Sequence, residues 1–338
     1  MTEQDRRVNW IDIAKGLSII FVVMGHSGDY AINHYLGWFR MPLFFALSGF
    51  LFKPVAPGLF AAWARKRIVR LLIPYFAYGL LIAFVILCAT GDISEFAKQL
   101  VKLPYGGQLL TGPFGVFWFI TCLLVTQVAF GFLSRFSTLT VAVVIAVCYA
   151  AAHLFVGFKT PLPWNADVAL MALPYYAMGF YLRGVLVKLV SKVYTLLFAA
   201  AVAAAAVLLD ANGAFTHAMD MKYKEYHNPL LDVAIALSIV TALCSACYWL
   251  SKIPAMRSLQ LLGTNTITIM YLHIPVNLAL KSVLHTEYGI VLFTLIGVSV
   301  PLLASIPIRR SGLLSRLYLG VRPQPALAPV SMAKRVSA

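Results

Sequence analysis

The sequence predicts an all-α integral membrane protein, a bundle of about ten transmembrane helices with both termini in the cytoplasm. Of its 338 residues, 61% are hydrophobic and only 12% are charged, and the mean hydropathy is +0.84. Ordinary soluble domains have roughly 45 to 50% apolar and about 25% charged residues. This chain therefore has too few polar side chains to cover a water-facing surface.

Apolar runs long enough to cross the hydrocarbon core, which takes about 20 residues, recur along the chain. Proline and glycine interrupt several of them, which is tolerated where neighbouring helices satisfy the backbone. We expect one transmembrane domain over residues 1–310 and a disordered cytoplasmic tail over 311–338. The ten predicted spans are 10–28, 36–52, 71–90, 114–133, 138–156, 167–187, 193–210, 229–250, 259–281 and 288–308.

The charges predict the orientation, because cytoplasmic loops collect Lys and Arg. With the amino terminus inside, most basic residues fall in inner loops, including the cluster at 65–70, and most acidic residues fall outside. The net charge of +15 is thereby explained without a nucleic-acid partner. All five cysteines lie within predicted spans, so no disulfide framework or metal site is indicated. We expect a multi-pass protein of the bacterial cytoplasmic (inner) membrane.

The first span contains three ionisable residues, Asp12, Lys15 and His26. Such groups are costly in a bilayer and most often mark a functional site. Lys15 and His26 are eleven residues apart, which places them within about 20° of one helical stripe and about 16 Å apart along it. Asp12 can pair with Lys15 at i, i+3. The alternative is that Asp12 and Lys15 snorkel to one interface and His26 is a satisfied polar residue at the other.

Several motifs resemble those of a known family. WIDIAKGLSIIFVVMGHS, followed by WFRMPLFFALSGFLF, is similar to the opening of the acyltransferase 3 family of membrane-bound O-acyltransferases, and within it to the fucose 4-O-acetylase-like branch. Three further motifs follow in order, from the loop between the second and third spans to the ninth span. They are R-x-x-R at Arg67 and Arg70, G-V-F-W-F-I at 115–120, and L-G-T-N-T-I-T-I-M-Y-L-H-I-P at 262–275.

The resemblance implies an enzyme that moves an acyl group, usually acetyl, from cytoplasmic acetyl-CoA to a hydroxyl of a carbohydrate or cell-envelope glycan at the outer side of the membrane. His26 would be the catalytic residue. As a general base it would take the proton of the attacking hydroxyl; an acyl-imidazole intermediate is the alternative. The implied partners are acyl-CoA, a carbohydrate acceptor and the lipid bilayer, with no metal or nucleic acid. Oligomeric state and acyl chain length stay open.

The donor side would involve three basic residues. Lys15 stands where the family more often has Arg, so it keeps the charge but lacks the bidentate fork; with Asp12 it would assist His26 or hold one phosphate oxygen. Arg67 and Arg70 are better phosphate ligands by geometry. Topology alone also predicts basic residues there.

The acceptor side would involve five residues. Arg40 stands where the family commonly has His; it would orient the acceptor or stabilise an oxyanion, or serve as an interfacial anchor. Asp29 could orient His26. Trp118 and Tyr271 could stack on a sugar, although packing is the commoner role of such aromatics. His273 needs a partner in the bilayer, which a structural hydrogen bond would also provide.

A transporter of a polysaccharide precursor or small metabolite is the other reading that ten spans permit. Transporters often show two related halves with broken helices in corresponding positions. No such repeat is evident, and the ionisable residues concentrate in the first two predicted spans and the loop after them. The sequence therefore favours the acyltransferase.

Overall fold

The computed structural model of the chain describes residues 3–158, 160–226 and 228–321, and within these residues every regular element is a helix. One isolated antiparallel bridge joins Asp220 to Glu225. The α-helices are α1 (Glu3–Met24), α2 (Tyr30–Gly37), α3 (Arg40–Phe50), α4 (Phe60–Thr90), α5 (Ile93–Tyr105), α6 (Phe117–Leu133), α7 (Thr138–Leu154), α8 (Ala166–Tyr181), α9 (Arg183–Val190), α10 (Val193–Ala211), α11 (Pro229–Leu250), α12 (Arg257–Thr264), α13 (Thr266–Leu284), α14 (Ile290–Arg310) and α15 (Gly312–Leu319). Short 3-10 helices are η1 (Gly107–Leu109), η2 (Gly112–Phe114), η3 (Pro163–Asn165) and η4 (Pro254–Met256).

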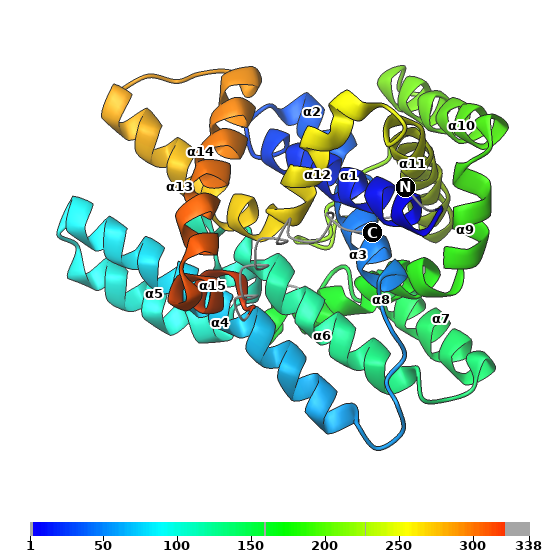
Figure 1. The fold of residues 1–338 in the computed structure, drawn as a ribbon, viewed down its shortest axis with the longest axis horizontal. Coiled ribbons are helices and arrows are strands. Elements are labelled where there is room, and N and C mark those ends of the chain that lie inside the picture. The colour runs from blue at the N-terminus through cyan, green and yellow to red at the C-terminus, as the bar shows by residue number, and fades with distance from the viewer. Residues whose placement is uncertain (1–2, 159, 227, 322–338) are drawn as a thin grey trace, which may run out of the picture.

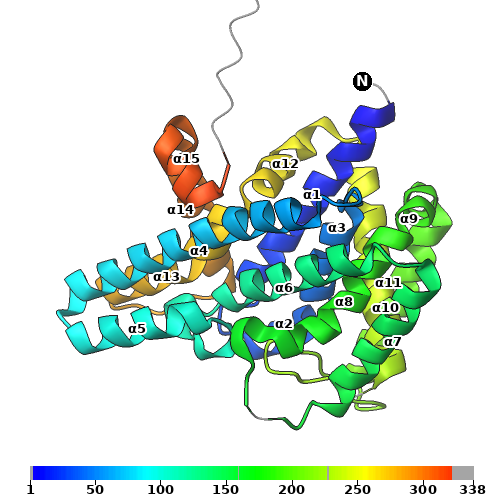
Figure 2. The ribbon, with the colours of Figure 1, turned by 90° about the horizontal axis from the view of Figure 1, so that it is seen from below.

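Helix α1 lies at the centre of the bundle (Figure 1), where it packs against α3 and against α11 to α14. Helices α4 to α8 lie along one side of it, and α9 to α11 cover another. In the second view, the amino-terminal end of α1 and helix α15 lie at one end of the molecule, and α2 lies at the opposite end (Figure 2). The carboxyl end of α1 therefore lies away from both termini of the described chain.

In the described part of the chain, six helices are long and apolar enough to cross a membrane. Helices η3 to α9 contain a bend of 67° at Leu182, and this pair makes a seventh if it is one broken span. Helix α7 is apolar but shorter. The six are Phe60–Thr90, Gly112–Leu133, Val193–Ala211, Pro229–Leu250, Thr266–Leu284 and Ile290–Arg310.

The helix bounds differ from the predicted spans at both ends of the chain, and the count of ten is not confirmed. Most of the predicted second span forms α3, and only its first two residues belong to α2. The 11 residues of α3 rise only about 16 Å, roughly half of the hydrocarbon thickness. Helix α4 begins at Phe60, eleven residues before the predicted third span. Its basic first turns include no Gly or Pro, so the helix runs through them into the apolar segment. The predicted ninth span divides at Asn265 into α12 and α13. Helix α15 lies in the predicted tail, whose residues 322–338 lie outside the described ones.

Two glycines let the first motif approach the last. A Cβ on Gly16 would lie 2.1 Å from the Leu259 carbonyl oxygen, and one on Gly263 would lie 1.9 Å from that of Asp12. Helices α1 and α12 thus touch backbone to backbone, the close approach that small residues allow between membrane helices. This crossing explains why glycine stands at position 16 in the first motif and at position 263 in the last.

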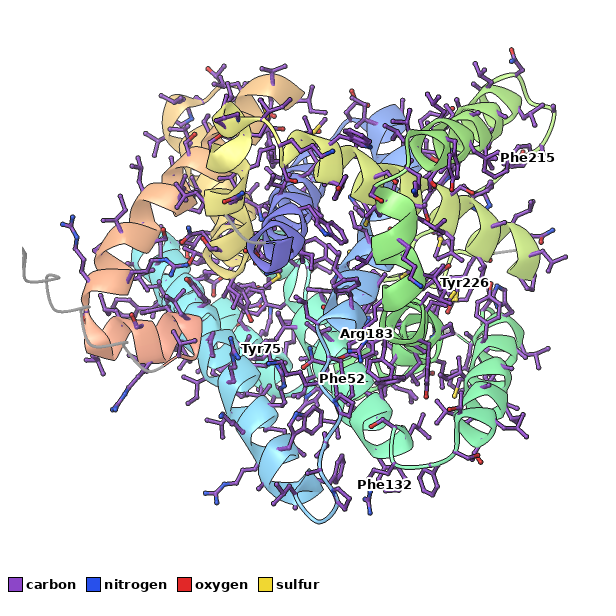
Figure 3. All side chains as sticks on the ribbon, turned by 45° about the vertical axis from the view of Figure 1, so that its right-hand side comes forward. Phe52, Tyr75, Phe132, Arg183, Phe215 and Tyr226 are labelled. Atoms are coloured by element: carbon purple, nitrogen blue, oxygen red, sulfur yellow. The ribbon has the colours of Figure 1, made fainter. Side chains whose placement is uncertain are left out.

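Aromatic side chains fill the bundle at the junction of α3, α6 and α8. The Phe52 ring lies 5.2 Å from that of Phe130 and 5.5 Å from that of Phe180, in edge-to-face contacts that are favoured for such pairs. The Arg183 guanidinium covers Phe180 at 4.7 Å and donates to the Phe52 carbonyl oxygen at 3.3 Å (Figure 3). This packing fixes α3, and with it Arg40 at its amino end.

Candidate active site

His26 lies two residues beyond the carboxyl end of α1. The helix ends at Met24, and the His26 amide donates to the Val23 carbonyl oxygen at 3.0 Å within a turn. The turn, and not the helical period, therefore sets the direction of the imidazole, and the predicted common stripe with Lys15 does not reach His26. The predicted ion pair is confirmed, since Lys15 Nζ lies 2.7 Å from Asp12 Oδ1.

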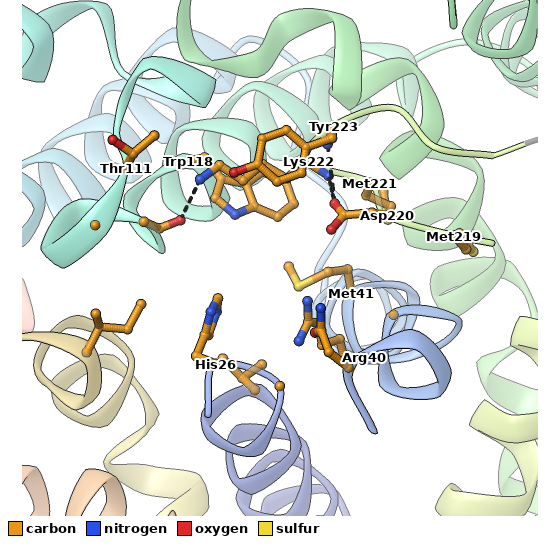
Figure 4. Close-up of a pocket in the computed structure, with 17 residues that line it drawn as sticks. His26, Arg40, Met41, Thr111, Trp118, Met219, Asp220, Met221, Lys222 and Tyr223 are labelled. Atoms are coloured by element: carbon orange, nitrogen blue, oxygen red, sulfur yellow. Dashed lines mark hydrogen bonds between the residues drawn. The ribbon is translucent and has the colours of Figure 1, made fainter. Parts of the chain in front are cut away.

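A cavity of about 250 Å³ adjoins the His26 imidazole. His26 and Arg40 enter it from one wall, and Trp118, Lys222 and Tyr223 form the opposite wall (Figure 4). These side chains come from the end of α1, the start of α3, the start of α6 and the loop between α10 and α11. Four segments that are far apart in the sequence thus converge on one polar cavity, which we call the outer pocket.

The loop at 219–225 folds back on itself across the outer pocket. The Asp220 carboxylate accepts from the backbone amides of Lys222 at 2.8 Å and Tyr223 at 3.2 Å, a side-chain turn typical of Asp. Lys224, with a φ of +61°, leaves on the far side, where its amine lies 2.9 Å from Asp167. Lys222 and Lys224 therefore anchor opposite sides of the loop.

Lys222 closes the pocket by bonding to backbone. Its Nζ donates to the carbonyl oxygens of Leu110 at 3.1 Å and Gly115 at 3.0 Å. Burial lowers the pKa of Lys222 to about 8, an effect that the nearby Asp220 charge partly opposes. The side chain thus fastens the loop to the segment before α6 and places a titratable charge over His26.

Histidine and carboxylate groups hold the beginning of the same loop. His34 Nε2 lies 2.9 Å from Asp210 Oδ2, and the other oxygen of Asp210 accepts from the His217 amide at 2.8 Å. The Trp38 indole donates to the His217 carbonyl oxygen at 3.0 Å. Helix α2, the end of α10 and the loop are thereby joined, so the pocket wall is built from long-range contacts.

Arg40 is buried at the wall of the outer pocket, with 8% of its surface exposed. Its Nη1 has no hydrogen-bond partner among the described residues. The guanidinium lies against the backbone of Gly25, where an added Cβ would be 1.7 Å from Nη1. The glycine before His26 therefore makes room for a cation beside the imidazole.

His273, from α13, lies beside His26. The two ring centroids are 5.3 Å apart, with 39° between the planes. His273 Nδ1 lies 3.0 Å from the Ile269 carbonyl oxygen and donates to it, so the proton of a neutral ring is on Nδ1. Its Nε2 has no partner among the described residues and is left as an acceptor.

A second, apolar cavity of about 30 Å³ also touches His26. Its walls include Ile19, Phe44, Phe119 and Met270. Ile19 belongs to α1, so this cavity lies on the side of His26 that faces the body of that helix. His26 thus lines both a polar cavity and a small apolar cavity, and Val22, Met41 and Trp118 line both as well.

A basic groove of about 1040 Å³ lies between α4 and α15. Arg65, Lys66, Arg70 and Arg316 line it. Arg67 is not among the lining residues; its guanidinium lies 5.7 Å from the centre of the Trp63 ring. The groove can hold phosphate groups, whereas no cluster of three or more metal-ligating His, Cys, Asp or Glu side chains occurs in the described ranges.

The structure brings together some of the predicted site residues and separates others. Arg40 and Trp118 line the outer pocket with His26, and His273 lies beside it. Asp29 instead caps α2, accepting from the Ile32 amide at 3.0 Å. Tyr271 is fully buried, and its ring stacks on that of Tyr78 at 4.5 Å.

Sequence reasoning missed Asp220, Lys222 and Tyr223, none of which it named as a site residue. The sequence feature that could have identified them is the run D-M-K-Y-K-E-Y at 220–226, in which charged and aromatic residues are interspersed. Such a run in a loop is unusual enough to nominate a binding surface.

The imidazole of His26 borders a polar cavity and a small apolar one. No curated protein and no solved structure is significantly similar to the chain. The sequence model of the acyltransferase 3 family, described as an acyltransferase domain, matches residues 8–310. Because that match covers nearly the whole chain, the protein belongs to the acyltransferase 3 family.

Proposed function

We propose that this protein is a membrane-bound O-acyltransferase that moves an acetyl group from cytoplasmic acetyl-CoA to a hydroxyl of a carbohydrate at the outer side of the membrane. The observation that carries the proposal is that His26 lines both the outer pocket and the apolar cavity. A hydroxyl bound in the polar space and a short acyl group bound in the apolar space would meet at the imidazole.

In the proposed reaction His26 acts as general base. The unprotonated imidazole nitrogen takes the proton of the acceptor hydroxyl as its oxygen forms a bond to the thioester carbonyl carbon. The tetrahedral intermediate then expels the thiolate of CoA, and the imidazolium returns the proton to that sulfur. An ester and free CoA are the products, and His26 ends as it began. General-base catalysis of this kind typically accelerates a reaction by roughly 10² to 10⁴-fold.

His273 supports this role by position. Its Nδ1–H is engaged by the Ile269 carbonyl oxygen, so Nε2 is available to accept a hydrogen bond, directly or through one water, from the neighbouring His26 ring. A donor nitrogen of His26 held in this way would leave the other nitrogen unprotonated. We propose His273 as a positioning residue.

The apolar cavity supports a short acyl chain. A site needs roughly 10 to 15 Å³ of such space for each water-sized group, so about 30 Å³ holds two to three heavy atoms. That is the size of an acetyl group. Phe44, Phe119 and Met270 close the cavity against a longer chain.

The basic groove supports the donor side of the proposal. Arg70, Arg65, Lys66 and Arg316 line one space, and guanidinium groups bind phosphate oxygens with paired donors. The groove lies at the same end of the molecule as the amino terminus (Figure 2), the end that the charge distribution assigns to the cytoplasm. We propose that it binds the phosphates of acyl-CoA.

The test is transfer of labelled acetyl from acetyl-CoA to envelope glycans by membranes that contain equal amounts of each variant. We expect His26→Asn to lower the initial rate by about 10² to 10⁴-fold. His285→Asn is the matched control, because His285 is exposed and has a φ of +50° that Asn tolerates. Equal rates for His26→Asn and wild type would contradict the assignment. Transfer absent from all membranes, wild type included, would favour a transporter.

A further inference from the structure

The outer pocket holds a buried cation that forms no ion pair with the described part of the protein. Arg40 is 8% exposed, its Nη1 has no hydrogen-bond partner, and its guanidinium forms no ion pair within 4.0 Å among the described residues. Buried charges are normally paired, because an uncompensated one loses its hydration without return. The missing partner is therefore expected to come from whatever the pocket binds.

The other charged residues of the pocket leave an excess of positive charge. Lys222 adds a second cation, whose Nζ is already bonded to the carbonyl oxygens of Leu110 and Gly115. Asp220 is the one carboxylate among the lining residues, and its Oδ1 is occupied by two amides of its own loop. With Arg40 and Lys222 against Asp220, the lining carries one net positive charge when His26 is neutral.

Aromatic rings occupy the wall opposite Arg40. Trp118 and Tyr223 both line the pocket, and the Tyr223 side chain is 52% exposed (Figure 4). A flat ring with polar edges packs well on the apolar face of a sugar. A cation on one wall and aromatic rings on the other match a sugar ring that carries an anionic substituent.

We propose that the acceptor is an acidic sugar, with a carboxylate bound by Arg40 while a neighbouring hydroxyl faces His26. The inference rests on the proposed function and names the substrate class of the same pocket. Arg is suited to the task because its planar fork binds a carboxylate through two parallel hydrogen bonds. Gly25 contributes to this carboxylate site, because any side chain at position 25 would displace the Arg40 guanidinium.

The experiment measures binding alone, with no acyl donor present. The full chain is purified in detergent, and its unfolding temperature is followed as each probe is added, because a ligand that binds only the folded state raises that temperature. The probes are D-glucuronate, its uncharged methyl ester, D-glucose, D-glucose 6-phosphate and inorganic phosphate. We expect glucuronate to raise the unfolding temperature, and the ester and glucose to have at least tenfold weaker effects at equal concentration.

The variants test whether Arg40 carries the recognition. We expect Arg40→Gln to weaken the glucuronate response at least tenfold, and Arg40→Lys, which keeps the charge without the fork, to weaken it less. Arg135→Gln is the matched control, because Arg135 is exposed and packs on Phe60 and Phe132 outside the pocket. The comparison of probes on the wild type stands even where a variant fails to fold.

The inference would be overturned by no response to glucuronate, by an equal response to glucose or to the ester, or by a glucuronate response that survives in Arg40→Gln. A response to inorganic phosphate equal to that of both charged sugars would also overturn it, since the site would then bind any small anion. A response to glucose 6-phosphate without one to glucuronate would likewise overturn it, because the site would then select a sugar phosphate and not a sugar carboxylate. Because no donor is present, failure of the acetyl-transfer test would leave this binding result standing.

Discussion

The imidazole rings of His26 and His273 lie 5.3 Å apart, centroid to centroid, although 247 positions separate them in the chain. His273 is held by the Ile269 carbonyl oxygen, and Asn277 donates to the His273 carbonyl oxygen at 2.7 Å and to that of Phe293 at 3.2 Å. The second ring is therefore fixed by α13 and α14, while the first sits on a turn beyond α1. With Nε2 of His273 held in place as a hydrogen-bond acceptor, the neighbouring His26 ring is expected to favour one tautomer.

Replacing His273 by Asn should lower kcat for acetyl transfer about 10 to 10²-fold with little change in either KM. The reason is that His26 would remain in place but would spend less time with the reactive nitrogen unprotonated and aimed at the hydroxyl. The measurement is the dependence of kcat on pH in membranes matched for protein amount. A loss of activity with an unchanged pH profile and a lowered unfolding temperature would assign His273 to structure alone.

Replacing Gly25 by Ala should weaken acceptor recognition without changing the KM for acetyl-CoA. The added Cβ would lie 1.7 Å from Arg40 Nη1, so the guanidinium must move, and overpacking of this kind typically costs about 1 to 3 kcal/mol. Steady-state kinetics with each substrate varied in turn gives the answer. Gly184→Ala serves as the control, because a Cβ there meets nothing within 4 Å. An acceptor KM equal to that of the control would contradict the packing argument.

Local interactions were predicted from the sequence because spacing alone determines them. The pairing of Asp12 with Lys15 follows from i, i+3 geometry in any helix, and the structure confirms it at 2.7 Å. The placement of Arg40 and Trp118 near His26 was suggested by the family motifs. These residues stand at the ends of helices, where short motifs carry enough information to locate them.

Long-range contacts were not predictable in the same way. Lys222 reaches its two carbonyl partners across 107 and 112 positions of the chain, and nothing in its own neighbourhood distinguishes it from a solvated loop charge. The break between α2 and α3 was missed because an apolar run does not reveal where a helix turns. His26 was assigned to a helical stripe because the period was continued two residues past the real helix end at Met24.

Acceptor binding should weaken as the pH rises through about 8. Burial lowers the pKa of Lys222 to about 8, so its charge, present at pH 7, is largely lost at pH 9, and the pocket keeps Arg40 against Asp220. Of the other titratable lining residues, His26 gains no charge as the pH rises, and the pKa of Tyr223 is raised, mainly by burial. The glucuronate response should therefore fall several-fold between pH 7 and 9, and Lys222→Met should abolish this dependence. A response that is flat over this range would contradict the prediction.

Lys222 should also make the fold more stable as the pH rises from about 8 toward 10.5, the ordinary pKa of a lysine. The sign follows from proton binding: in this window the unfolded chain holds the Lys222 proton and the folded chain has released it, so raising the pH favours the folded state. Below pH 8 both states hold the proton and the contribution is constant. Chemical denaturation of wild type and Lys222→Met across pH 7 to 10 measures the difference in slope. Equal slopes would show that the pKa of Lys222 is not lowered in the folded protein.

Enlarging the apolar cavity should extend the range of acyl donors. Phe119→Leu opens a wall of the 30 Å³ space beside His26, and each methylene accommodated in such a pocket changes discrimination by roughly 10-fold or more. We expect the ratio of kcat/KM for butyryl-CoA to that for acetyl-CoA to rise at least tenfold. Phe132→Leu, on the same helix but 44% exposed, is the control and should leave the ratio unchanged. A ratio that rises equally in both variants would exclude the cavity as the determinant.

The two arginines of the R-x-x-R motif should differ in their effect on the donor. Arg70 lines the basic groove with Arg316, whereas Arg67 lies over Trp63. We expect Arg70→Gln and Arg316→Gln each to raise the KM for acetyl-CoA several-fold at low ionic strength, and Arg67→Gln to leave it near the wild-type value. Because Arg70 and Arg316 are exposed, added salt should screen their attraction for phosphate and shrink the difference. If Arg67→Gln raises the KM as much as Arg70→Gln does, the motif acts as one unit and the groove between α4 and α15 is not the donor site.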